Sequence, residues 1–332
     1  MRMRNTFLMA LCCSALPWLI GCGGAHDSTE KYYLVATNIK IPYWQSVRAG
    51  LLREAGRMGV KAEMVGPDAF DPKAEHDAFQ EVLGQKIKPS GILVSAADPA
   101  IMQPDIDAAI AKGIPVVTVD ADAPASKRLT FIGTDNYKAG IMGAQLAVKQ
   151  LQGKGNVVIF TMPEQTNLKD RMHGYQDGFE PHLGIKVVET IDIKGDPRIA
   201  FDHTQELVDK KIIDKIDGFV CLEAVACPEV VDVLDRNKVG NKVVVAMDTD
   251  PRTLDAIKRG RVAGAIAQKP FTMGFVGVAT LDVMHHNPPT PLDKVWADDP
   301  LAPVPAFIGT GQVLVDKSNV DAFLAETSQQ GQ

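Results

Sequence analysis

The chain has 332 residues, of which 45% are hydrophobic, 23% charged and 6% aromatic. This balance is that of a globular protein with one large or two medium-sized cores, and it excludes disordered and fibrous proteins. Thirty-five Lys and Arg residues against 41 Asp and Glu residues give a net charge of -6 without a long basic run, so we expect no nucleic-acid partner.

The first 22 residues have the pattern of an export signal. Two arginines precede an apolar run from Phe7 to Ile20, which is shorter than the roughly 20 apolar residues of a membrane-spanning helix. The run ends in Leu19-Ile20-Gly21-Cys22, which resembles a bacterial lipoprotein box. We expect removal of residues 1–21, a lipid on Cys22, and a protein anchored to the membrane in the periplasm or on the outer cell surface. A plain secretory signal and an uncleaved N-terminal anchor are the alternatives.

Residues 22–30 are small and polar and predict a lipidated, flexible tether. Beyond it, short β-branched runs alternate with helical patterns, which predicts an α/β protein with two doubly wound parallel sheets. In chain order we expect a strand at 32–37, a helix at 42–58, a strand at 61–66, a helix at 71–85, a strand at 91–95, a helix at 99–112 and a strand at 115–120, and then strands at 156–161, 186–192, 218–223 and 242–248 that each precede a helix.

Two segments of the chain repeat one pattern. The sequence PVVTVDADAP at 115–124 and the sequence KVVVAMDTDP at 242–251 each place acidic residues after an apolar strand, which indicates two similar halves. In such sheets ligands bind beyond the carboxyl ends of the strands. The polar residues expected at those ends are Thr37, Asp120, Glu223 and Asp248.

These residue types suit a neutral ligand with several hydroxyl groups. A carboxylate accepts hydroxyl hydrogen bonds, and the flat rings of Tyr43 and Trp44 can cover one face of a sugar ring. Trp44 also lies on the apolar face of its helix, so core packing is an equally good interpretation for it. We expect Asp122 and Asp250 to cap the helices that follow, which leaves Asp120 and Asp248 for the ligand.

An enzyme is an alternative because VVVAMDTDPRT resembles the phosphotransfer motif of haloacid-dehalogenase-like phosphatases, with Asp248 as the nucleophile. The motif comes too late in the chain for that family, and motifs of other hydrolases and of nucleotide binding are absent, so we expect no enzyme and no cofactor. The pair His285-His286 fits a helix end better than a metal site, and we expect no metal. Cys221 and Cys227 form either a disulfide or two packed thiols.

From about Tyr32 to Phe323, the chain resembles the ribose-binding type of periplasmic sugar-binding protein of bacterial ABC importers, which is related to the effector domains of LacI-type repressors. The resemblance rests on the order of six segments: IPYW at 41–44, PVVTVD at 115–120, GTDN at 133–136, RMHGYQDGF at 171–179, VVVAMD at 243–248 and AIAQKPFTMG at 265–274. The chain begins with an export signal instead of a DNA-binding helix-turn-helix, which argues against a repressor.

The resemblance implies two lobes that are joined by three crossings and close on a ligand. It implies a first lobe of residues 31–133 and 269–303, a second of residues 134–268 and 304–326, and a tail at 327–332. By position it implies ligand-binding roles for eight residues: Tyr43 and Trp44 in stacking, Asp120 and Asp248 as acceptors, Glu223 in the place of a pocket Asn, Gln268 at the hinge, and Lys169 or Arg171 as a cation.

Specificity is expected to differ from that of the ribose binders. They have an Asp-Arg pair where this chain has Asp120-Ala121, and Ile41 replaces an Asn. A pocket with one guanidinium fewer and one carboxylate more than that of the ribose binders fits another pentose, a hexose, a cyclic polyol or an amino sugar. We therefore expect a monomeric, lipid-anchored receptor that delivers a monosaccharide-like ligand to an ABC permease. A receptor that signals through a chemoreceptor or sensor kinase is the alternative.

Overall fold

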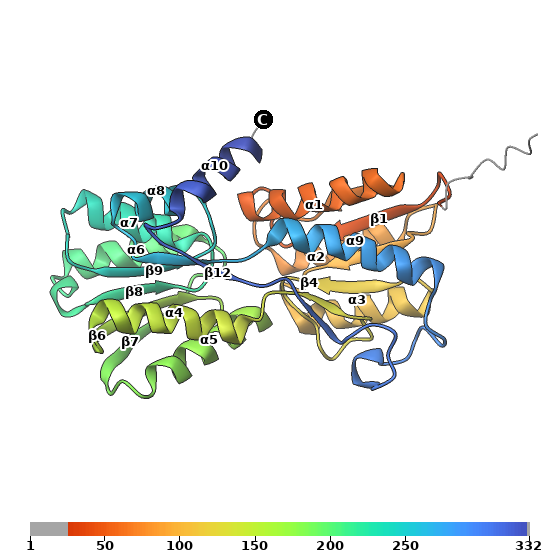
Figure 1. Ribbon diagram of the computed structural model, residues 1–332. Coiled ribbons are helices and arrows are strands. Elements are labelled where there is room, and N and C mark those ends of the chain that lie inside the picture. Colours follow the sequence, from red (N-terminus) through yellow and green to blue (C-terminus); the bar gives the residue numbers. More distant parts are fainter. Residues whose placement is uncertain (1–25, 331–332) are drawn as a thin grey trace, which may run out of the picture.

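The computed structural model describes residues 26–330, which form two α/β lobes joined by three crossings of the chain (Figure 1). The sheet of the first lobe has the strand order β11-β5-β4-β3-β1-β2, and every pair in it is parallel. The elements of this lobe are β1 (Lys31–Val35), α1 (Pro42–Met58), β2 (Lys61–Val65), α2 (Pro72–Leu83), β3 (Gly91–Val94), α3 (Pro99–Ala111), β4 (Val116–Val119), β5 (Phe131–Gly133), α9 (Pro270–His286) and β11 (Phe307–Gly309).

The second lobe repeats this arrangement with the strand order β12-β10-β9-β8-β6-β7. Its elements are α4 (Asn136–Leu151), β6 (Lys154–Thr161), α5 (Thr166–Phe179), β7 (Gly184–Asp192), α6 (Pro197–Asp209), β8 (Gly218–Cys221), α7 (Ala226–Arg236), β9 (Val243–Met247), α8 (Pro251–Arg259), β10 (Gly264–Ala267), β12 (Val313–Val315) and α10 (Val320–Gln330). The edge strand β12 is antiparallel to β10, whereas the other pairs are parallel. The predicted pair of doubly wound α/β lobes is thus confirmed, with one antiparallel edge strand that the sequence pattern did not indicate.

Each sheet is apolar on both faces because helices cover both. In β1, Tyr32 and Leu34 pack with α1 and α9, whereas Tyr33 and Val35 pack with α2 and α3. Strand β6 alternates in the same way between the pair α4 and α5 and the group α6, α7 and α8. Burial on both faces explains why these strands are continuous apolar runs instead of alternating ones.

The helices begin and end at residues that satisfy free backbone groups. Helix α1 has Pro42 in its first turn and ends at Gly59, whose φ of 77° is the left-handed conformation that glycine adopts without strain. Aspartate side chains accept backbone N–H bonds at the start of five helices, namely Asp71, Asp98, Asp135, Asp196 and Asp250. Asp250 therefore caps α8 as predicted.

The prediction that Asp122 caps a helix is wrong. No helix begins there, since β5 follows β4 directly. The carboxylate of Asp122 instead forms a bidentate ion pair with Arg128, with its Oδ2 2.6 Å from Nη2, and accepts a hydrogen bond of 2.6 Å from the Thr118 hydroxyl.

Close helix pairs lie on one face of each sheet. A Cβ atom at Gly274 of α9 would come 2.0 Å from the carbonyl oxygen of Val47 in α1. A Cβ atom at Gly174 of α5 would come 2.2 Å from the carbonyl oxygen of Tyr137 in α4. Side chains larger than hydrogen would force these helices apart. The glycine at position 174 thus sets the position of α5, which carries several residues of the site described below.

The three crossings follow β5, β10 and β11. The carbonyl oxygen of Gly133 accepts hydrogen bonds from both the backbone N–H and the hydroxyl of Thr310, at 2.8 and 3.1 Å, so the first and third crossings are joined. The predicted lobe boundary at 304 is wrong, because β11 pairs with β5 in the first sheet. Residues 304–309 therefore belong to the first lobe, and the third crossing lies between Gly309 and Val313.

The segment before β1 differs from the predicted tether. Cys22 and the rest of the expected signal lie outside the described residues. Within residues 26–30, Glu30 is buried and His26 contacts Asp282 of α9 at 3.0 Å, so this part packs against the first lobe. No helix within residues 26–330 is long and apolar enough to span a membrane. Cys221 and Cys227 are both buried free thiols.

Candidate ligand-binding site

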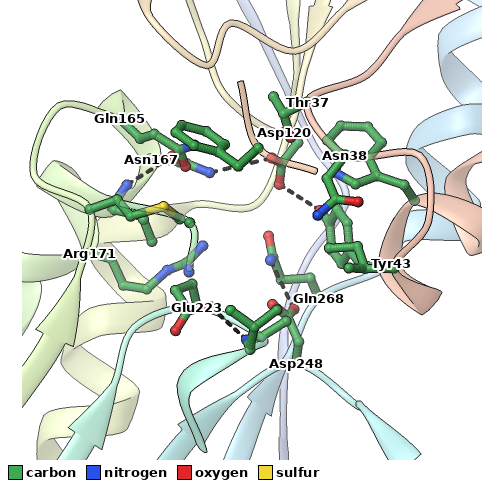
Figure 2. A pocket seen from close by; sticks show the side chains of 18 residues that line it. Thr37, Asn38, Tyr43, Asp120, Gln165, Asn167, Arg171, Glu223, Asp248 and Gln268 are labelled. Carbon is green, nitrogen blue, oxygen red and sulfur yellow. Dashed lines mark hydrogen bonds between the residues drawn. The ribbon is translucent and has the colours of Figure 1, made fainter. Parts of the chain in front are cut away.

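A cavity lies between the two lobes, at the carboxyl ends of both sheets (Figure 2). Both lobes and a chain crossing line it, so a molecule inside would touch both halves of the protein. The first lobe contributes Thr37, Asn38, Ile41, Tyr43, Trp44, Phe70 and Asp120; the second contributes Met162, Gln165, Asn167, Leu168, Arg171, Gly195, Glu223, Ala224, Val225 and Asp248; Gln268 belongs to a crossing.

Asp120 and Asp248 occupy equivalent places in the two lobes. Each follows a central strand, each has a φ of 66°, and each donates its backbone N–H to the neighbouring strand, Asp120 to Ile132 and Asp248 to Ile266. Aspartate tolerates this left-handed conformation better than most residues, and such conformations concentrate at functional sites. The repeat seen in the sequence thus corresponds to one local geometry that turns a carboxylate into the cavity from each side.

The two carboxylates have different partners. The Tyr43 hydroxyl donates a hydrogen bond of 2.6 Å to Oδ1 of Asp120. The side-chain amide of Gln268 donates a hydrogen bond of 2.9 Å to Oδ1 of Asp248, and its oxygen accepts one of 2.7 Å from the Thr134 hydroxyl. Gln268 therefore connects Asp248 to the first crossing of the hinge. Burial raises the pKa of Asp120, and it raises the pKa of Asp248 to about 6 although Arg171 opposes the shift.

Arg171 supplies the positive charge of the cavity. Its guanidinium is 2% exposed and donates hydrogen bonds to the carbonyl oxygen of Leu222 and, at 2.5 Å, to the side-chain oxygen of Asn136. Its Nε–H is buried and has no hydrogen-bond partner. A buried donor without a partner is costly, and Figure 2 shows this side chain at the edge of the cavity, where a ligand can provide an acceptor.

Glu223 has a structural role besides its place in the cavity wall. Its two carboxylate oxygens accept the backbone N–H groups of Val225 and Ala226, at 2.5 and 2.9 Å, where α7 begins. Burial raises the pKa of Glu223 to about 7 even though these hydrogen bonds oppose the shift. The carboxylate therefore holds a helix start and is partly committed before any ligand arrives.

Three aromatic rings border the cavity. Tyr43 and Trp44 meet edge to face at 5.5 Å between ring centroids. Trp44 is 2% exposed and packs in the core with α9 and β1, so the core interpretation accounts for most of its surface, while its remaining edge lines the cavity. Phe70, in the loop after β2, is the third ring and was not predicted.

The structure brings together seven of the eight predicted site residues and leaves out Lys169. That lysine is exposed on α5 and does not line the cavity, so the cation of the site is Arg171. The two are less than one helical turn apart and face different directions. Asp250 is also absent from the wall because it caps α8, so the Asp248–Asp250 pair of the phosphatase alternative is not assembled in the cavity.

The lobes touch each other around the cavity. The Thr166 hydroxyl of α5 accepts the backbone N–H of Asp122 at 3.1 Å and donates to its carbonyl oxygen at 2.9 Å. The amide of Asn167 reaches Oδ2 of Asp120 across the gap at 3.4 Å. Phe70 packs closely on Gly195 of the opposite lobe: a Cβ atom added at Gly195 would lie 2.4 Å from the Cβ atom of Phe70. These contacts describe a closed arrangement of the lobes.

The protein has two lobes, a hinge of three crossings, and between the lobes a cavity with aromatic, charged and amide side chains. Together these features define a protein that binds a small solute by closure. The chain matches the family described as periplasmic binding protein domain over residues 32–285, and it belongs to that family. The resemblance inferred from the sequence segments is thereby confirmed.

Three relatives illustrate this relationship. The chain is 23% identical to the ribose import binding protein of Bacillus subtilis (strain 168), over 85% of this chain and 91% of that protein. An arabinose-binding protein from Geobacillus stearothermophilus shares 28% identity at a TM-score of 0.73, over 89% of this chain and 99% of that one. A solute-binding protein of an ABC transporter from Burkholderia graminis, in complex with D-arabinose, shares 26% identity at a TM-score of 0.78, over 88% and 96%.

Proposed function

We propose that this protein captures a monosaccharide or a closely related polyhydroxy ligand between its lobes and delivers it to the permease of an ABC importer. The relatives with ribose and arabinose in their names or complexes support this class of ligand. A lipid on Cys22 would hold the protein at the outer face of a membrane, where it acts as a monomer and catalyses nothing.

The single observation that carries the proposal is the position of Asp120 and Asp248. They belong to opposite lobes and border the same cavity, where Asp248 is buried and Asp120 is half-buried. A ligand shifts an open–closed equilibrium only if it binds the closed form better. Hydroxyl groups that donate to both carboxylates at once meet that condition, because the two acceptors come together only on closure.

The side chains that line the cavity also indicate how the ligand is recognised. Aromatic rings from the first lobe provide flat apolar surface, and amides and carboxylates provide acceptors and donors around it. One guanidinium, that of Arg171, stands among three carboxylates, so a ligand with an acidic group is disfavoured. We infer a neutral sugar or polyol, with an amino sugar as the cationic variant of the same class.

The experiment that tests this is a thermal-shift screen followed by calorimetry. Aldopentoses including ribose and arabinose, aldohexoses, ketoses, polyols, amino sugars and nucleosides are tested on the untagged protein. A ligand at 100 times its dissociation constant adds about 2.7 kcal/mol to the free energy of unfolding, which is visible as a higher melting temperature. For the ligand found, Asp248→Ala should weaken binding by at least about 1 kcal/mol, because it removes a charged acceptor.

Lys169→Ala is the matched control for that measurement. It lies on the same helix as Arg171 but outside the cavity, so it should bind as the wild type does. Equal affinity of wild type and Asp248→Ala would remove Asp248 from the site. A shift with a nucleoside alone would place the ligand outside the sugar class.

A further inference from the structure

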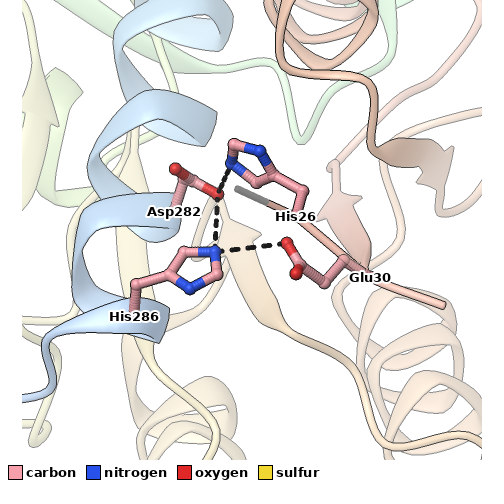
Figure 3. A group of neighbouring side chains, drawn as sticks. All are labelled: His26, Glu30, Asp282 and His286. Carbon is pink, nitrogen blue, oxygen red and sulfur yellow. Dashed lines mark hydrogen bonds and ion pairs between the residues drawn. The ribbon is translucent and has the colours of Figure 1, made fainter. Parts of the chain in front are cut away.

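Four side chains that can bind a metal ion meet at the end of the first lobe opposite the cavity (Figure 3). His26 and Glu30 lie in the segment before β1, and Asp282 and His286 lie one turn apart on α9. The cavity is at the carboxyl ends of the strands, whereas this group is at the start of β1. It is therefore separate from the proposed sugar site and independent of that function.

Three distances within the group are close to those between the ligands of a tetrahedral metal site. One nitrogen from each histidine and one oxygen from each carboxylate all lie within 4.8 Å of one another. Nε2 of His26 is 3.0 Å from Oδ1 of Asp282, and Nε2 of His286 is 3.5 Å from that same oxygen and 3.3 Å from Oε2 of Glu30. Four ligands placed tetrahedrally at about 2.0–2.2 Å from a zinc ion are about 3.3–3.6 Å apart.

One atom of the group has no hydrogen-bond partner. Glu30 is 6% exposed, and its Oε1 accepts the backbone N–H of Asp27 at 2.5 Å. Its Oε2 is buried without a hydrogen-bond partner and, as Figure 3 shows, points toward His286. A buried carboxylate oxygen whose nearest donor is an imidazole at 3.3 Å, outside hydrogen-bond geometry, costs free energy, and a cation at the centre of the group would remove that cost.

A neighbouring residue holds one of the carboxylates in place. The hydroxyl of Tyr32, in β1, donates a hydrogen bond of 2.9 Å to Oδ1 of Asp282. Outer partners of this kind orient the ligands of metal sites. Two carboxylates and two neutral imidazoles around a divalent cation also sum to zero charge, which favours such a group where it is partly buried.

We propose that His26, Glu30, Asp282 and His286 bind one divalent transition-metal ion of the zinc class. Imidazole and carboxylate ligands in a tetrahedral arrangement suit Zn²⁺. The ion joins the segment that leads into β1 to the last turns of α9, 252 positions away between Glu30 and Asp282. It therefore fixes the N-terminal segment of the domain to the body of the first lobe.

The test uses the untagged protein, stripped of metal with a chelator and titrated with Zn²⁺ in a calorimeter and with Co²⁺ in a spectrophotometer. We expect one equivalent of Zn²⁺ per chain, a visible absorption band of four-coordinate Co²⁺ that Zn²⁺ displaces, and a higher melting temperature with metal. His26→Ala and His286→Ala should each weaken binding by about 100-fold, since even the loss of an outer partner of a ligand lowers affinity about 10- to 100-fold.

His173→Ala is the control, because His173 is exposed on α5 in the other lobe and is not one of the four ligands. It should bind Zn²⁺ as the wild type does. Circular dichroism of each variant without metal shows whether it is folded. Absence of stoichiometric Zn²⁺ binding to the wild type would overturn the proposal, and so would equal affinity of the wild type, His26→Ala and His286→Ala.

Discussion

Asp248 and Glu223 hold their protons more tightly in the folded protein than in the unfolded chain. Burial raises their pKa values to about 6 and about 7, from ordinary values near 4. In the window between those values the folded state binds more protons than the unfolded state, so the free energy of unfolding contributed by these groups increases as the pH falls. The ionised forms, which accept hydroxyl groups best, are thus the forms that destabilise the ligand-free fold.

This pH dependence of the free energy of unfolding predicts how the melting temperature changes with pH. Without ligand, the wild type should have a higher melting temperature at about pH 5 than at about pH 8, and Asp248→Asn should reduce this difference because it removes one titrating carboxyl. Asp248→Asn should also be the more stable protein at about pH 8 while binding sugar more weakly. Differential scanning fluorimetry across the pH range measures both melting curves.

Asp202→Asn is the control for that series, because Asp202 is exposed. It should leave the pH dependence of the melting temperature as in the wild type. A melting temperature of Asp248→Asn that changes with pH as much as that of the wild type would show that Asp248 is ionised without cost in the fold.

Most of the candidate site could be predicted because its residues follow strands. Asp120 and Asp248 come directly after apolar runs, and that order alone places them at the carboxyl edge of a parallel sheet. Phe70 and Asn167 could not be found in this way. Phe70 follows a loop without periodicity, and Asn167 enters the cavity through the start of α5, whose position depends on packing against α4.

At the scale of elements, helix positions in the second lobe depend on glycines at the α4–α5 contact. Gly174→Ala should lower the free energy of unfolding by about 2 kcal/mol, because its Cβ atom would overlap the backbone of α4 at Tyr137 and Ile141. The gain in helix propensity of about 1 kcal/mol from Gly to Ala is smaller than the cost of this overlap. Urea unfolding followed by circular dichroism measures the difference.

For Gly56→Ala we expect the opposite effect on the free energy of unfolding, and this variant serves as the comparison. Gly56 is in α1, and a Cβ atom there would meet nothing within 4 Å. The substitution should therefore stabilise the protein by about 0.5–1 kcal/mol. If Gly174→Ala stabilised the protein as much as Gly56→Ala does, the close approach of α4 and α5 would be refuted.

The order of helices and strands along the chain could be predicted, but the pairing partners of the strands at the sheet edges could not. Apolar strands that alternate with helices of clear period indicate doubly wound sheets without further information. Strands β11 and β12 have three residues each, too few for a pattern, and they join different sheets although they are neighbours in the chain. Strand β11 pairs with β5 and strand β12 with β10, and no local sequence signal indicates these partners.

At the scale of the whole molecule, the proposed lipid anchor determines where the protein works. In cells that produce the full chain, the protein should fractionate with membranes, and Cys22→Ala should move it to the soluble fraction, because two or more acyl chains are needed for stable anchoring and Cys22 is their proposed site. Mass spectrometry of the purified N-terminus checks for the lipid.

Cys13→Ser is the control for the anchor, since Cys13 lies within the expected signal and should leave the mature protein unchanged. A wild-type protein that is recovered entirely in the soluble fraction would support a plain secretory signal instead. Membrane retention of Cys22→Ala would support an uncleaved N-terminal anchor.

The different partners of the two equivalent aspartates have a consequence for stereochemistry. The backbone has the same conformation at the two aspartates, yet a phenol lies beside Asp120 and an amide bonded to the hinge lies beside Asp248. A sugar that entered back to front would meet the wrong donor at each end. The cavity therefore distinguishes the two ends of its ligand, and epimers that differ at a single carbon should bind with different affinities even though both carry the same number of hydroxyl groups.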